Sequence, residues 1–173
     1  MDEKRIKQAE NNFKNYLQEG KIKKVSSPIQ LIYDTYLRNA RESLKVANQL
    51  FQSKTSYLWV IVTSYYSMFY IVCAYLYKLG YKPGEELVHQ VVNESLIIQG
   101  RSKIKNYLLE NYAEEKEKAL IIVDNYLDNY EREKAKRSSL QYQTTESIKE
   151  SKAKTSLDRA KEFLTLMEEI LAK

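Results

Sequence analysis

Apolar residues recur along most of this chain with the spacing of amphipathic helices, but residues 55–77 contain no charge and show no polar face. A helix that is apolar all round lies either inside a protein or inside a membrane. Six residues of this stretch are Tyr and five are Ser or Thr. The hydroxyls of Tyr65 and Tyr66, near its middle, need hydrogen-bond partners that lipid cannot provide. We therefore predict the central helix of a protein core and no membrane association.

Two amphipathic helices are predicted before the central one. The first covers residues 2–19 and ends at Gly20. The second begins at Pro28, is capped by Ser27, and runs to about Gln52, so it should lie antiparallel to the central helix. Its predicted buried stripe is Ile32, Tyr36, Ala40, Ser43, Ala47 and Leu50.

The remainder of the chain is also predicted to be helical. A short helix over about 85–99 is followed by about 40 residues of helical character, with a break expected near 111–113. The last helix carries apolar residues at alternating spacings of four and three, which is typical of a packing stripe or a dimer seam. These residues are Ala153, Leu157, Ala160, Leu164, Met167 and Leu171.

Length and composition indicate one all-α domain spanning residues 1–173. The chain has only four Gly and two Pro in 173 residues, and no run of alternating β-branched residues. Residues 1–24, a helix followed by a basic loop, are expected at the periphery of a core formed by residues 28–172. The net charge of +5 permits a nucleic acid or another acidic partner.

Several chemistries are excluded by what the sequence lacks. One His and one Cys cannot form a zinc site, and no glycine-rich phosphate loop is present, so we expect no metal and no cofactor. Cys73 lies inside the apolar stretch, which favours a buried thiol in a reducing compartment. With no apolar signal region at the N-terminus, we expect a cytoplasmic protein.

Two places in the sequence could carry chemistry. His89 lies among apolar residues of the short helix, and it is either a half-buried structural histidine or a proton-transfer group facing a cleft. Arg137 ends a basic run that is either a solvated face or, together with Tyr142, a phosphate site. We expect Arg137 and Tyr142 to face one cleft with His89 and with Tyr65 or Tyr66 close by.

Three segments in the same order resemble motifs of the HEPN family, in particular its small stand-alone members. Residues 137–142 read RSSLQY, where these members have R-x-x-A-D-Y. Residues 64–69 read SYYSMF and resemble their A-Y-Y-A-M-F-H helix. Residues 79–83, LGYKP, followed by 89–92, HQVV, resemble their G-x-x-P…H-x-x-[IV] passage.

The resemblance implies an up-and-down antiparallel bundle of four or five main helices, commonly dimeric. It also implies a minimal nucleotidyltransferase as partner in a toxin–antitoxin module. Many members are RNases with an Arg followed after four to six residues by His. Here positions 142, 143 and 144 hold Tyr, Gln and Thr, so the chain departs from the ribonuclease motif. The absence of that His favours a binding protein over an enzyme.

Three functions remain open from the sequence. The first is a HEPN-type protein that binds a nucleotide or an RNA phosphate near Arg137 and Tyr142, as the partner of a nucleotidyltransferase. The second is a metal-independent RNase toxin that uses Arg137 with His89 or a tyrosine. The third is a helical oligomerisation module that binds no ligand.

Overall fold

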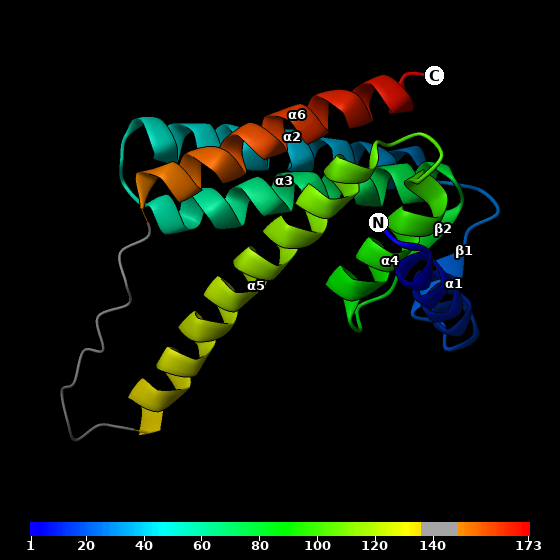
Figure 1. Ribbon diagram of the computed structural model, residues 1–173, viewed down its shortest axis with the longest axis horizontal. Helices are drawn as coiled ribbons and strands as arrows, with labels where there is room; N and C mark the ends of the chain where they lie inside the picture. The colour runs from blue at the N-terminus through cyan, green and yellow to red at the C-terminus, as the bar shows by residue number, and fades with distance from the viewer. Residues whose placement is uncertain (136–148) are drawn as a thin grey trace.

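The computed structural model describes residues 1–135 and 149–173, and the side chains of residues 1–125 and 149–173. Within these residues the chain forms six helices and two short strands (Figure 1). The elements are α1 (Glu3–Gln18), β1 (Ile22–Lys24), α2 (Gln30–Gln52), α3 (Tyr57–Lys78), β2 (Tyr81–Pro83), α4 (Val88–Gly100), α5 (Asn106–Ala135) and α6 (Glu150–Leu171). The prediction of an all-α bundle is confirmed.

Helix α3 is the centre of the molecule, with α2, α5 and α6 packed around it (Figure 1). It begins after Ser56, whose side chain accepts a hydrogen bond from the Trp59 N–H and so caps the helix. Tyr65, Tyr75 and Tyr77 are among its buried residues. By length and composition α3 could cross a membrane, but 67% of its most apolar window is buried inside the protein. Its burial is typical of a soluble protein's core helix, as the mid-span tyrosines predicted.

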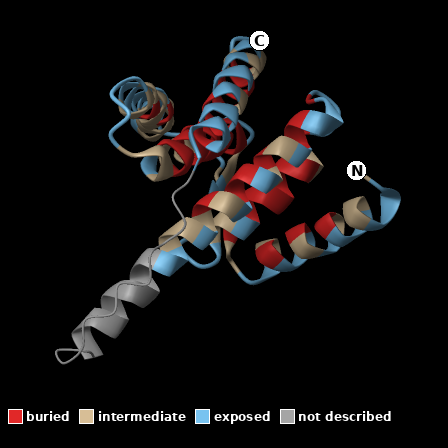
Figure 2. Cartoon of the chain, turned by 60° about the vertical axis from the view of Figure 1, so that its left-hand side comes forward, coloured by how far each residue is buried: buried red, intermediate tan, exposed pale blue. Residues whose placement is uncertain are grey.

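The apolar stripe of α6 packs inside the chain (Figure 2). All six of its residues are buried against α3 and its neighbours, and even Leu171, at the end of the helix, is only 8% exposed. The alternative interpretation of this stripe as a dimer seam is therefore wrong. A stripe with coiled-coil spacing fits any neighbouring helix, and here the neighbour is α3 of the same chain.

A smaller, more polar layer lies beside this bundle and is formed by α1, α4 and the two strands (Figure 1). The strands pair antiparallel, with Ile22 opposite Pro83 and Lys24 opposite Tyr81. Gly80 precedes β2 with a φ of +81°, a conformation that only glycine adopts without strain. The sequence predicted no strand because three residues are too few to show a period of two.

Three predicted helix boundaries need correction. Helix α2 begins at Gln30 and not at Pro28, because the Ile29 N–H donates to the Tyr77 hydroxyl at 3.0 Å instead of to a Ser27 cap. Helix α4 begins at Val88 because Leu87 has a left-handed φ of 50°. Helix α5 has no break at residues 111–113, where Tyr112 is fully buried.

Candidate functional site

The candidate site is centred on His89, in the first turn of α4, and Tyr65, in the middle of α3. The Tyr65 hydroxyl and His89 Nδ1 are 2.8 Å apart and form a hydrogen bond between the two helices. Tyr65 is fully buried, whereas His89 is half-buried. With Nδ1 engaged by Tyr65, Nε2 is the ring nitrogen left for an external partner.

Aromatic rings surround His89 on the side of α3. Its ring centroid lies 4.7 Å from that of Phe69 and 5.8 Å from that of Tyr66, which meets it edge to face. Tyr66 is itself only partly buried. These contacts fix the orientation of the imidazole and leave it at the edge of the core, where a ligand could stack on or hydrogen-bond to it.

The electrostatic surroundings keep His89 neutral at pH 7. Burial lowers its pKa from the ordinary 6.5, and the positive charge of Lys116 on α5 lowers it further. Burial also raises the pKa of Tyr65 far above the ordinary value, so its phenol keeps its proton. The pair is therefore an uncharged hydrogen-bonded unit that can pass a proton or bind a polar group.

Tyr112 supports Tyr65 from the other side. Its ring centroid lies 5.9 Å from that of Tyr65 and 5.6 Å from that of Phe163 on α6, so the three rings connect α3, α5 and α6. The Tyr112 hydroxyl is fully buried, and no described residue meets the geometric limits of a hydrogen bond to it. It still lies close enough to Tyr65 to influence the pKa of that phenol. We assign it a packing role, because its ring connects three helices and its buried hydroxyl lacks a hydrogen-bond partner among the described residues.

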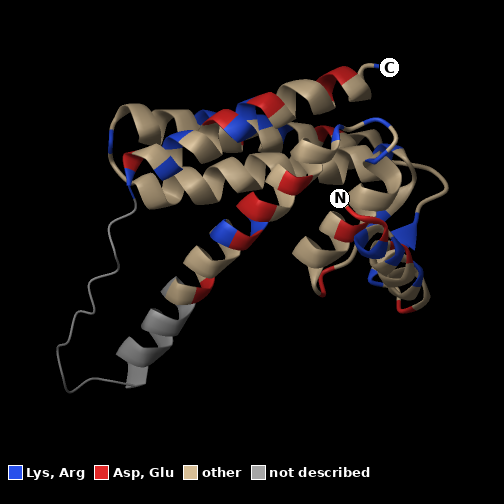
Figure 3. Ribbon diagram, in the orientation of Figure 1, with Lys and Arg blue, Asp and Glu red and all other residues tan. Residues whose placement is uncertain are grey.

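Helix α5 carries acidic and basic residues (Figure 3), and one of them, Lys116, acts on His89. Glu115 is fully buried and accepts from Arg159 at 2.7 Å and from Lys118 at 3.0 Å. Lys116, only 8% exposed, pairs with Glu117 at 2.8 Å. Glu114 and Glu115 thus join α5 to α6 through Arg159.

The structure brings together three of the five residues that the sequence singled out, namely Tyr65, Tyr66 and His89. Arg137 and Tyr142 lie outside the described residues, so their place in the same cleft stays a prediction. Sequence reasoning missed Lys116 and Tyr112, and also an ion pair between Arg5 and Glu94 at 2.6 Å. A lone acid in an otherwise apolar run, as at Glu94, was the one available signal of a buried pair.

Comparison with known proteins identifies the family. A model described as the HEPN domain matches residues 33–170, which leaves α1, β1 and the first residues of α2 outside the match. No curated protein and no solved structure matches the chain. The match covers most of the 173 residues and contains all three motifs noted in the sequence. This chain therefore belongs to the HEPN domain family.

Proposed function

We propose that this protein binds the phosphate of a nucleotide or of RNA at a site formed by His89, Tyr65, Tyr66, Arg137 and Tyr142. Membership of the HEPN family supports a role related to nucleotides or RNA. The observation that carries the proposal is the Tyr65–His89 pair, which holds an uncharged imidazole at the edge of the core. Partly exposed Tyr66 beside it offers a ring on which a base can stack.

Arg137 would supply the charge for this site. A guanidinium binds two phosphate oxygens at once, and the Tyr142 phenol adds a further donor. We expect Arg137→Ala to weaken binding of a labelled single-stranded RNA by about 1–3 kcal/mol, or roughly 5- to 150-fold, as measured by fluorescence anisotropy. Arg137→Lys should not restore binding, because an ammonium cannot form the two-pronged contact.

Two further variants complete this experiment. His89→Phe keeps the ring packing but removes Nε2, and it should also weaken binding. Arg38→Ala, at an exposed arginine of α2 outside the proposed site, controls for a general loss of positive charge. Equal binding by wild type, Arg137→Ala and His89→Phe would refute the phosphate site.

One observation favours RNA cleavage as a second candidate function. The lowered pKa of His89 leaves a neutral imidazole at pH 7, and a neutral imidazole can accept a proton from a ribose hydroxyl. Arg137 would then stabilise the charge that develops on the phosphate. Incubation with labelled RNA and EDTA should give cleavage that both His89→Phe and Arg137→Ala abolish. Intact RNA after incubation with the wild-type protein would rule out cleavage and leave binding as the one proposed function.

The proposed partners are a second copy of this chain and a minimal nucleotidyltransferase. Self-association is supported by exposed Ile29 and Leu31 at the start of α2, which are 58% and 72% exposed. Light scattering should give twice the chain mass of 20.4 kDa at micromolar concentration. The neighbouring reading frame is expected to encode the nucleotidyltransferase, and the two proteins should then co-elute. A monomer that elutes without the nucleotidyltransferase would contradict both proposed partners.

A further inference from the structure

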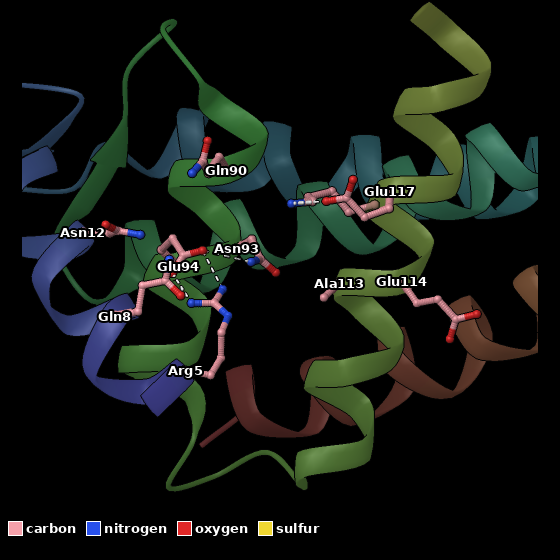
Figure 4. Close-up of a pocket in the computed structure, with 10 residues that line it drawn as sticks. Arg5, Gln8, Asn12, Gln90, Asn93, Glu94, Ala113, Glu114 and Glu117 are labelled. Carbon is pink, nitrogen blue, oxygen red and sulfur yellow. Dashed lines mark hydrogen bonds and ion pairs between the residues drawn. The ribbon is translucent and has the colours of Figure 1, made fainter. Parts of the chain in front are cut away.

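A polar cavity of about 580 Å3 lies between α1 and α4 on one side and α5 on the other (Figure 4). Its size falls within the range of small-molecule binding sites. Helix α1 contributes Arg5, Gln8 and Asn12 to the lining, and this helix precedes the residues that match the HEPN domain. The cavity is thus formed in part by a segment that the family match does not include.

The charged groups around this cavity already have partners. Arg5 donates to both carboxylate oxygens of Glu94, at 2.7 and 2.6 Å. Lys116 pairs with Glu117 at 2.8 Å, and Glu114 pairs with Lys118 and Arg159. Because these charges are matched, the cavity favours a neutral ligand that forms hydrogen bonds over an anion such as a phosphate.

Four amide side chains supply most of the remaining hydrogen-bonding capacity, from Gln8, Asn12, Gln90 and Asn93. Asn93 is the most informative because it is only 3% exposed. Its amide nitrogen makes a long contact of 3.4 Å with Glu94, and its oxygen points into the space between α4 and α5 (Figure 4). The Asn93 oxygen is open to the cavity, so a ligand there can hydrogen-bond to it.

We propose that this cavity binds a nucleobase, and that adenine fits its donors and acceptors best. One Asn or Gln amide matches the N6 donor and N7 acceptor of adenine together. The same edge of guanine needs two donors, which an arginine usually provides, and the Arg5 guanidinium is occupied by Glu94. The inference deepens the proposed function and rests on it.

The position of the cavity relative to His89 supports this assignment. His89 and Asn93 are four residues apart on α4 and therefore lie on the same face of that helix. Lys116 lines the cavity and also lowers the pKa of His89, so its charge acts at both places. A nucleotide with its base in the cavity would extend its sugar and phosphate towards His89.

Two kinds of ligand distinguish the cavity from the proposed phosphate site near His89. Nucleosides carry only the base and the sugar, whereas ribose 5-phosphate carries only the sugar and the phosphate. We would titrate adenosine, guanosine, cytidine, uridine and ribose 5-phosphate into the full chain and follow each titration by calorimetry or NMR. Adenosine should bind at least about fivefold more tightly than guanosine, the lower bound for one amide–base contact. Ribose 5-phosphate should bind independently of the amides.

The variants are Gln90→Ala and Asn93→Ala, with Gln49→Ala on α2 as the control amide. Gln90 and Gln49 are both exposed, so neither substitution should affect folding, whereas Asn93→Ala requires a check by thermal unfolding. Both cavity variants should lose the preference for adenosine, and the control should keep it. If ribose 5-phosphate binds but no nucleoside does, or if Gln90→Ala leaves the preference intact, the inference is overturned while the proposed function stands. If nothing binds, both fail.

Discussion

The bundle of α2, α3 and α6 and the layer of α1 and α4 against α5 use different interactions. In the bundle, α3 and α6 bury most of their apolar side chains, whereas α2 buries only Ala40 and Ala47 completely. The hydroxyls of Ser64, Ser67 and Ser156 have no hydrogen-bond partner among the described residues. In the polar layer, buried Glu94 of α4 is paired with Arg5 of α1, and buried Glu115 of α5 is paired with Arg159 of α6 in the bundle. The comparison suggests that the bundle supplies stability and that the polar layer supplies the surfaces that can bind.

The largest expected effect comes from the bundle. Phe163 is fully buried on α6 and stacks against Tyr112. Phe163→Ala should lower the free energy of unfolding by about 3–5 kcal/mol, since the cavity left behind adds to the lost burial. Ile121→Ala, at a 58% exposed position on α5, should change it by less than about 0.5 kcal/mol. Urea unfolding measures both, and similar losses would show that burial does not decide stability here.

A smaller effect is expected from the polar layer. Arg5→Ala leaves Glu94, whose side chain is 6% exposed, buried without its charged partner. Because Arg5 itself is 31% exposed, we expect a loss of about 2 kcal/mol, below the cost for a fully buried pair. Arg101→Ala is the matched control, because Arg101 and Glu10 are both more than 40% exposed and should contribute under about 1 kcal/mol. Equal losses in urea unfolding would contradict the importance of burial.

The contact between the two regions should contribute less again. Tyr65→Phe removes only the hydroxyl that bonds to His89 and keeps the ring packing. We expect a loss of about 1 kcal/mol in thermal or urea unfolding, the usual value for one hydrogen bond. Tyr107→Phe removes an exposed hydroxyl that donates to Glu162 at 2.6 Å and should cost only a few tenths of that. If Tyr65→Phe leaves the free energy of unfolding unchanged, the bond orients His89 without stabilising the fold.

The smallest expected effect is a pH dependence from His89. Its pKa is lowered in the folded state, so the unfolded chain binds a proton more readily. Wild type should therefore lose stability as pH falls through about 6.5, the ordinary pKa of histidine, while His89→Phe should not show this component. Denaturation midpoints between about pH 5 and pH 8 measure the difference. If the stability of wild type relative to His89→Phe increases as the pH falls, the pKa of His89 is raised in the folded state instead.

Part of the site could be predicted from the sequence because its signals are local. Tyr65 and Tyr66 stood out as hydroxyls inside an apolar helix, and His89 as the only histidine in the chain. The resemblance of residues 64–69 and 89–92 to HEPN motifs pointed to the same residues. No local signal indicated that Lys116 and Tyr112 would join them, because both come from α5 and reach the site only through packing.

The sequence by itself determined the all-α class, the central position of the apolar stretch 55–77 and the buried stripe of the last helix, because helical periodicity and composition are encoded within a few turns. Tertiary structure decided which neighbour each stripe packs against, where α2, α4 and α5 begin or continue, and how charges pair. Arg5 and Glu94 are 89 residues apart, and no local pattern encodes a contact across that distance. The cavity between α1, α4 and α5 exists for the same reason: its lining comes from three helices that are brought together by burial of their apolar faces and by the Arg5–Glu94 pair.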